Sequence, residues 1–149
     1  MYAKTNEQVT EYCELYRKLN VVYEEYAREV GLSYSSLRTL CIIYDNHDGC
    51  TQKTICDNSF LPKQTVNAIV TGFLKRGFIK LTEIKTDRRR KIIHLTESGM
   101  EFAKGLVPKI KISENKAMDK LDEGQRAALL ETTRLFFANF HELMKEKGQ

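Results

Sequence analysis

Residues 78–95 read FIKLTEIKTDRRRKIIHL, and this stretch predicts a β-hairpin with a strongly basic tip. Two short runs of β-forming residues flank residues 85–91. These seven residues carry five basic side chains and one acidic side chain, a net charge of +4 that equals the formal net charge of the whole chain. Because like charges at this density repel one another, we expect the tip to face a polyanion, and the backbone of duplex DNA is the obvious one.

The basic charge is confined to the middle third of the chain. Residues 53–91 carry ten basic and three acidic side chains, whereas residues 1–52 carry five basic and eight acidic, and residues 92–149 carry nine of each. A basic region confined to one part of a protein is stronger evidence for nucleic-acid binding than an overall pI near 8.8.

The residues before the hairpin predict a helix-turn-helix. Thr51 is expected to cap a short helix over residues 52–58, and a break follows at residues 59–61. Pro62 suits the first turn of the next helix, which runs to about Arg76 and ends at Gly77. Two helices joined by a turn of three or four residues form a helix-turn-helix, and the hairpin after them is the "wing".

Long amphipathic helices are predicted on both sides of this lobe. Residues 7–30 form the first, with Gly31 as its C-cap, and Ser33 or Ser35 caps a second helix that ends before a turn at residues 45–49. Thr96 caps a helix that continues to about residue 120 with a kink at Pro108, and Asp122 caps the last one. Strands are expected over residues 78–84 and 92–95.

The expected fold class is therefore mainly α with a small β-wing, built as a winged helix-turn-helix domain plus an N- and C-terminal helical dimerisation region. We expect a single domain over residues 1–149, with the DNA-binding lobe at about 33–97 and the dimerisation region at about 5–30 and 98–147. One small lobe cannot bury the apolar faces of three further helices, so we expect a homodimer. The chain has neither an apolar run of about 20 residues nor a signal peptide, which favours the cytoplasm and no membrane partner.

This order of elements resembles the MarR family of bacterial transcription regulators. One motif is the segment TQKTICDNSFLPKQTVNAIVTGFLKRGFI, which leaves its last helix through residues 74–79, LKRGFI. Another is TDRRRKIIHLTESG, with Asp87 and Arg89 as its Asp-x-Arg signature, and the flanking helices match in length. The resemblance covers nearly the whole chain. It implies a homodimeric, ligand- or redox-responsive repressor that binds a near-palindromic operator in double-stranded DNA.

Candidate DNA contacts lie on three elements. The N-terminal residues of a recognition helix face base edges in the major groove, the start of the preceding helix can hold a phosphate, and the wing can reach the adjacent minor groove. The candidates are Thr51, Gln52, Lys53, Lys63, Gln64, Thr65, Asn67, Thr71, Lys85, Asp87, Arg88, Arg89, Arg90 and Lys91. Arg89 is the prime candidate for the minor groove, and Asp87 is expected to pair with it and orient the tip.

The effector is less well specified. Family members often bind small molecules between the DNA-binding lobe and the helical region. The candidate lining residues are Tyr12, Cys13, Tyr16, Tyr34, Leu37, Cys41 and Tyr44, and ordinary core packing is the favoured explanation for them. A redox alternative places a reactive thiol at Cys13, with Tyr12 and Tyr34 as its neighbours.

Other function classes have weaker support in the sequence. His47, Cys50 and Cys56 are spaced too loosely for a typical zinc site, so we expect neither a metal nor a cofactor. The three histidines lie far apart in the sequence and no Gly-rich phosphate loop occurs, which argues against an enzyme. A protein–protein adaptor that uses the basic wing for an acidic partner remains open.

Overall fold

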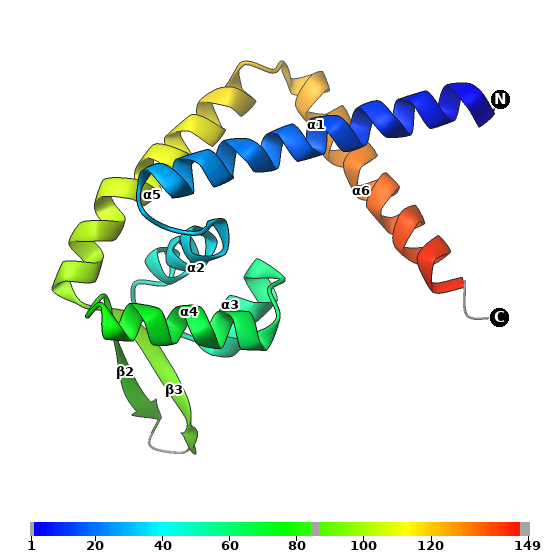
Figure 1. The fold of residues 1–149 in the computed structure, drawn as a ribbon. Helices are drawn as coiled ribbons and strands as arrows, with labels where there is room; N and C mark the ends of the chain where they lie inside the picture. Colours follow the sequence, from blue (N-terminus) through cyan, green and yellow to red (C-terminus); the bar gives the residue numbers. More distant parts are fainter. Residues whose placement is uncertain (1, 85–86, 147–149) are drawn as a thin grey trace. The chain divides into compact units, whose positions relative to one another are not determined.

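The computed structural model describes residues 2–84 and 87–146, with the side chains of residues 2, 3, 84, 88 and 89 outside that description. The chain divides into two compact units, Met1–Val107 and Pro108–Gln149. The first holds the winged helix-turn-helix and the second is helical (Figure 1). The expected fold class, mainly α with a small antiparallel sheet, is confirmed.

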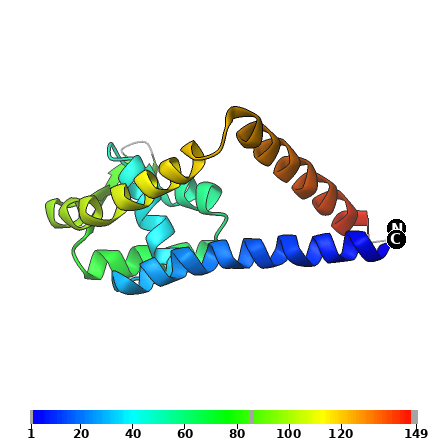
Figure 2. The same ribbon diagram turned by 90° about the horizontal axis from the view of Figure 1, so that it is seen from above.

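The first unit begins with the long helix α1 (Tyr2–Glu29), which Figure 2 shows as one continuous rod. After the helix, the chain turns at Gly31, whose φ is +72°, and the N–H of Leu32 donates to the carbonyl of Ala27 over 2.8 Å. Helix α2 (Tyr34–Asp45) follows at once, and Ser33 accepts the N–H of Ser36 as its N-cap. The predicted C-cap glycine and one of the two predicted serine caps are thus confirmed.

The helix-turn-helix consists of α3 (Gln52–Ser59) and α4 (Lys63–Lys75). Thr51 caps α3 through a capping box, in which its hydroxyl accepts the N–H of Thr54 and its own N–H donates to the hydroxyl of Thr54. Phe60 turns the chain with a left-handed φ of +57°, and its side chain is 89% exposed. Pro62 precedes the first helical residue instead of lying in the first turn as predicted, because its extended ψ of 144° makes it the N-cap.

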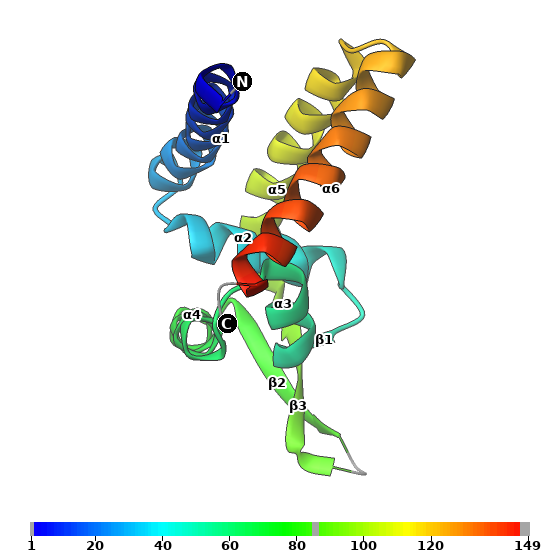
Figure 3. The same cartoon turned by 90° about the vertical axis from the view of Figure 1, so that its right-hand side faces the viewer.

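The sheet contains one strand more than the sequence predicted. Strand β1 (Cys50–Thr51) pairs antiparallel with β3 (Asp87–Leu95), and β3 pairs with β2 (Ile79–Ile84) in the hairpin, giving the order β1-β3-β2. Figure 3 shows the hairpin extending beyond α3 and α4. At Gly49 a Cβ atom would lie 2.5 Å from the side chain of Ile92, so only glycine lets β1 approach β3 this closely.

The strand limits also differ from the prediction. Phe78 lies outside β2, and β3 begins at Asp87 and not at Ile92. The ladder explains this difference, since Glu83 pairs with Lys91 and Ile84 pairs with Asp87 across a register shift. Most of the basic segment that the sequence assigned to the tip is therefore strand.

The core of the first unit joins every layer of the lobe. Leu40 and Ile43 of α2, Ile55 of α3 and Val66 of α4 are fully buried, and Ile93 of β3 packs among them. This core fixes α3 and α4 on the base of the wing, so the exposed side chains of all three elements form one surface.

Helix α5 (Glu97–Asp119) begins after Thr96, whose hydroxyl accepts the N–H of Gly99 as predicted for a cap. It continues through Pro108, where the two compact units meet in sequence, and the predicted kink stays a prediction. Helix α6 (Glu123–Lys145) is capped by Asp122 through a capping box with Gln125, as expected, and buries none of its residues. Within the described part of the chain, no helix is both long and apolar enough to cross a bilayer.

Candidate nucleic-acid interface

Helix α4 has a buried apolar face and an exposed polar face, as a recognition helix does. Its inner face holds Val66, Val70 and Phe73, all buried. Its outer face, near the N-terminus, exposes Lys63, Gln64, Asn67, Ala68 and Thr71, and Thr65 is half-buried. The amides of Gln64 and Asn67 are groups that can pair with adenine in the major groove, and lysine can serve guanine or phosphate.

The start of α3 lies beside this face. The capping box occupies the N–H groups of Thr51 and Thr54, which leaves those of Gln52 and Lys53 at the open end of the helix. Such N–H groups, together with the helix dipole, suit a phosphate oxygen. Lys53 lies next to them, although its ammonium group also forms an exposed salt bridge of 2.5 Å with Asp57.

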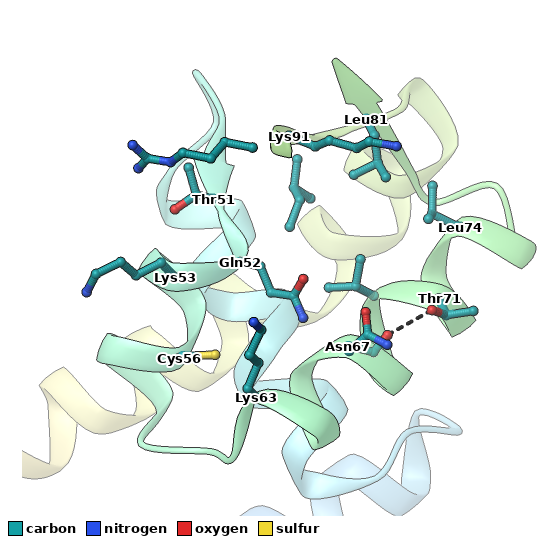
Figure 4. Close-up of a pocket in the computed structure, with 13 residues that line it drawn as sticks. Thr51, Gln52, Lys53, Cys56, Lys63, Asn67, Thr71, Leu74, Leu81 and Lys91 are labelled. Carbon is teal, nitrogen blue, oxygen red and sulfur yellow. Dashed lines mark hydrogen bonds between the residues drawn. The ribbon is translucent and has the colours of Figure 1, made fainter. Parts of the chain in front are cut away.

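A hollow of about 670 Å³ lies between α3, α4 and the wing (Figure 4). Its walls include eight of the fourteen candidate DNA contacts, drawn from β1, α3, α4 and β3. These are Thr51, Gln52, Lys53, Lys63, Asn67, Thr71, Arg90 and Lys91. The fold therefore brings residues that lie up to 40 positions apart in the sequence around one concave, basic surface.

The hollow has a cationic rim and an apolar floor. Lys53, Lys63, Arg90 and Lys91 supply the positive charge, and Val70, Leu74, Leu81 and Ile93 supply the apolar surface. Of the four cations, Lys53 is the one with a carboxylate at salt-bridge distance among the described residues. Thr71 donates its hydroxyl proton to the carbonyl of Asn67 over 2.9 Å, so its oxygen remains an acceptor toward the hollow (Figure 4).

The other candidate contacts are distributed differently. Gln64 and Thr65 lie on α4 outside the hollow, and Asp87 is an exposed residue at the start of β3. Lys85 lies outside the described residues, as do the side chains of Arg88 and Arg89. The insertion of Arg89 into a minor groove and its pairing with Asp87 therefore stay predictions.

The candidate effector residues lie on α1 and α2. Tyr12 and Cys13 are half-buried and Tyr16 is half-exposed, while Leu37 is buried and Cys41 and Tyr44 pack against the core of the lobe. Tyr34 stacks on Tyr23, with 5.6 Å between ring centroids. Tyr23 follows Cys13 by ten residues, which corresponds to about 15 Å along a helix. The geometry thus places Tyr34 against a later part of α1 than the thiol hypothesis assumed.

Sequence reasoning missed the floor of the hollow and Cys56. Cys56 follows Gln52 by four residues in α3, so both lie on one helix face, and this spacing was a signal that could have placed Cys56 at the interface. The four cysteines are free thiols, and the described residues contain no group of three or more side chains that could hold a metal ion.

This arrangement of fold and basic surface defines a winged helix-turn-helix protein, and comparisons with known proteins show which family it is similar to. A model of the MarR family matches residues 30–90, which include α2, α3, α4 and most of the wing. Over these residues the chain matches the MarR family of transcription regulators.

Individual relatives agree with this assignment. The chain is 26% identical over 115 residues to the HTH-type transcriptional repressor NicR of Pseudomonas putida, a match that covers 77% of this chain and 72% of NicR. The solved structure of NMB1585, a MarR family regulator from Neisseria meningitidis, has a TM-score of 0.79 at 21% identity, covering 94% of this chain and 98% of that one. BpsR of Bordetella bronchiseptica, whose DNA binding is regulated by 6-hydroxynicotinic acid, has a TM-score of 0.63 at 16% identity, covering 85% and 98%.

Proposed function

We propose that the protein is a transcriptional repressor that binds a near-palindromic operator in double-stranded DNA as a homodimer. The observation that carries this proposal is the basic hollow, in which the start of α3, the outer face of α4 and the wing converge. A phosphate backbone suits its cationic rim, and the outer face of α4 offers amides and hydroxyls to base edges.

The apolar surfaces of the terminal helices support the homodimer. Val9, Leu15, Leu19 and Val22 of α1 are 41–62% exposed, and α6 exposes a longer series in the second unit. That series is Leu129, Leu130, Leu135, Phe137, Phe140, Leu143 and Met144. Large apolar side chains at this density are unfavourable in water and mark a protein–protein interface. A two-fold dimer would cover both sets and supply two DNA-binding lobes for two half-sites.

A small-molecule effector that modulates DNA binding completes the proposal. The half-buried tyrosines of α1 and α2 are the candidate lining, and the regulation of BpsR by 6-hydroxynicotinic acid supports the idea of an effector without identifying the one bound here. Oxidant sensing through Cys13 is the second candidate. A DNA-binding repressor acts where the chromosome lies, so we place it in the cytoplasm and assign it no enzymatic activity.

The direct test is selection of binding sites from a random duplex library at near-physiological salt. We expect enrichment of a two-fold symmetric site, and we expect Lys63→Ala and Arg89→Ala to weaken binding to that site by a few kcal/mol. Lys104→Ala changes an exposed lysine of α5 and serves as the matched control. If no sequence is enriched and the variants bind as weakly as the parent, the proposal is wrong and the adaptor hypothesis gains support.

A further inference from the structure

The hollow contains a nucleophile that DNA binding does not require. Cys56 lies in the middle of α3 and is partly exposed, and its sulfur lines the hollow. Figure 4 shows the thiol directed toward the space beside the end of Lys63, with Lys53 one helical turn earlier. The thiol therefore faces a cavity with a cationic rim rather than open solvent.

A second observation shows that this cavity suits a ligand. The Nε2 nitrogen of Gln52 is buried and has no hydrogen-bond partner in the described structure. Figure 4 shows its amide directed into the hollow between Lys63 and Asn67. A buried donor without an acceptor is costly, so an acceptor group that enters the hollow would be favoured there. The cations around it favour an anionic acceptor, and a carboxylate oxygen meets that requirement as a phosphate oxygen does.

The surroundings of Cys56 also distinguish it from the other cysteines. Cys50 is 5% exposed, and burial raises the pKa of its thiol to about 11, so it stays protonated and inaccessible at neutral pH. Cys41 is packed against the core beside Tyr26. Cys13 is half-buried on α1, away from the basic hollow. Among the four, only Cys56 combines access with a cationic cavity.

We propose that Cys56 is a site of reversible modification by small anionic disulfides and that the adduct blocks the DNA-binding surface. In this step the thiolate of Cys56 attacks one sulfur of the disulfide, a new S–S bond forms to Cys56, the original S–S bond breaks, and the other half leaves as a thiolate. Cys56 and the leaving sulfur exchange oxidation states, so no further oxidant is needed. A carboxylate on the bound half lies among the cations and can accept the free hydrogen of Gln52.

The consequence for DNA follows from the position of the adduct. Its body occupies a hollow that eight candidate DNA contacts line, and its carboxylates place negative charge where phosphates would bind. Reduction by a thiol removes the adduct and restores the surface. The effect on DNA rests on the proposed function, whereas formation of the adduct does not.

The experiment uses the full chain and measures two steps separately, the modification of Cys56 and the resulting loss of DNA affinity. Glutathione disulfide is the anionic probe and bis(2-hydroxyethyl) disulfide is the neutral one. Intact mass and peptide mapping give the rate and position of modification, and fluorescence anisotropy with selected operator DNA gives the affinity. We expect the anionic probe to modify Cys56 first, about tenfold faster than the neutral probe relative to their rates on a free thiol, with an advantage that falls as salt is raised. We expect the adduct to lower DNA affinity at least about tenfold, and excess thiol to restore it.

Cys56→Ser is the principal control, and Cys13→Ser is matched to it. The DNA affinity of Cys56→Ser is measured before treatment as its own reference, and treatment with either disulfide should leave that affinity unchanged, whereas Cys13→Ser should lose affinity on treatment as the parent does. Earlier modification of another cysteine, equal relative rates for the two probes, or full DNA affinity with Cys56 modified would each overturn the proposal. If the untreated protein binds no DNA, the proposed function fails, and the mass and rate data still decide whether Cys56 is the modified site.

Discussion

Gly99 in the first turn of α5 lies directly against the backbone of Phe78 at the base of the wing. A Cβ atom built on Gly99 would be 1.8 Å from the carbonyl oxygen of Phe78, and that oxygen also accepts the N–H of Thr96 over 3.0 Å. The hydroxyl of Thr96 donates to the carbonyl of Gly77 over 2.6 Å. The junction between the wing and α5 is therefore a backbone-to-backbone contact that only glycine permits.

The first prediction concerns this junction. Gly99→Ala should lower the free energy of unfolding by about 3 kcal/mol or more, because the added methyl group meets the carbonyl of Phe78, which is held in place by the N–H of Thr96 and cannot move aside freely. Urea denaturation monitored by circular dichroism measures the change. Gly105→Ala is the control in the same helix, since a Cβ there meets nothing within 4 Å and alanine should stabilise the helix by up to about 1 kcal/mol. Equal stability for the two variants would contradict the contact.

Local signals in the sequence were sufficient to predict most of the helices and their ends. Gly31 and Gly77 adopt positive φ at helix ends, and Thr51 and Asp122 form capping boxes, so short-range chemistry determined where the helices begin and end. Strand β1 was missed because it has two residues and exists only through long-range pairing of Cys50 with Ile93. The wing tip was predicted too long because the register of β2 and β3 depends on pairing that composition does not encode.

The candidate site was predictable in residue type but not in shape. Charge localisation indicated Lys53, Lys63, Arg90 and Lys91, and the structure places these four around one hollow. Nothing in the sequence showed that the hollow would have an apolar floor, since Leu74 and Leu81 read as ordinary core residues of a helix and a strand. The packing between helices and strands decides which half-buried side chains line a cavity. A single sequence contains no direct signal for that packing.

The second prediction concerns alkaline pH. Burial raises the pKa of the Cys50 thiol from 9.0 to about 11, so the folded state favours the protonated form. In the unfolded chain this thiol ionises near its ordinary pKa. The stability that the folded state gains from holding the thiol protonated is therefore fully present below pH 9. As pH rises from about 9 to about 11 that contribution disappears, which amounts to up to about 3 kcal/mol.

The measurement is the free energy of unfolding as a function of pH for the parent chain and for Cys50→Ala. Other groups titrate in the same range, so the difference between the two proteins is the informative quantity. The disadvantage of Cys50→Ala, caused by poorer packing at neutral pH, should shrink or reverse above pH 10. A difference that stays constant from pH 7 to pH 11 would show that Cys50 titrates normally in the folded state.

The third prediction concerns salt. If Lys63 binds a phosphate, Lys63→Gln should weaken DNA binding and flatten the dependence of log K on log salt concentration. The slope should change by about 0.9 for each phosphate that is no longer neutralised, or by about 1.8 for a dimer with two copies of the lysine. Anisotropy titrations from low to moderate salt give both slopes. Lys104→Gln removes an exposed lysine of α5 and should leave the slope unchanged. An unchanged slope for Lys63→Gln would assign this lysine to base recognition or to solvent.

The fourth prediction concerns the homodimer. Phe140 is 55% exposed in α6 and Leu19 is 52% exposed in α1, and no described residue of α6 is buried. If a second copy covers these faces, Phe140→Glu and Leu19→Glu each place a charge in an apolar interface. Each should raise the dissociation constant of the dimer at least about thirtyfold, corresponding to about 2 kcal/mol at the centre of an interface. Sedimentation velocity across a concentration series measures the shift toward monomer.

Ala138→Glu is the matched control for this last prediction, because residue 138 lies on the face of α6 opposite Phe140 at 100° per residue. It adds the same charge to the same helix and should leave the dimer intact. DNA affinity provides a second readout, since a monomer has one lobe and reads one half-site, so the two interface variants should lose operator affinity while keeping the circular dichroism of the parent. Dimers of unchanged strength in both interface variants would mean that something other than a second copy of the chain covers these helices.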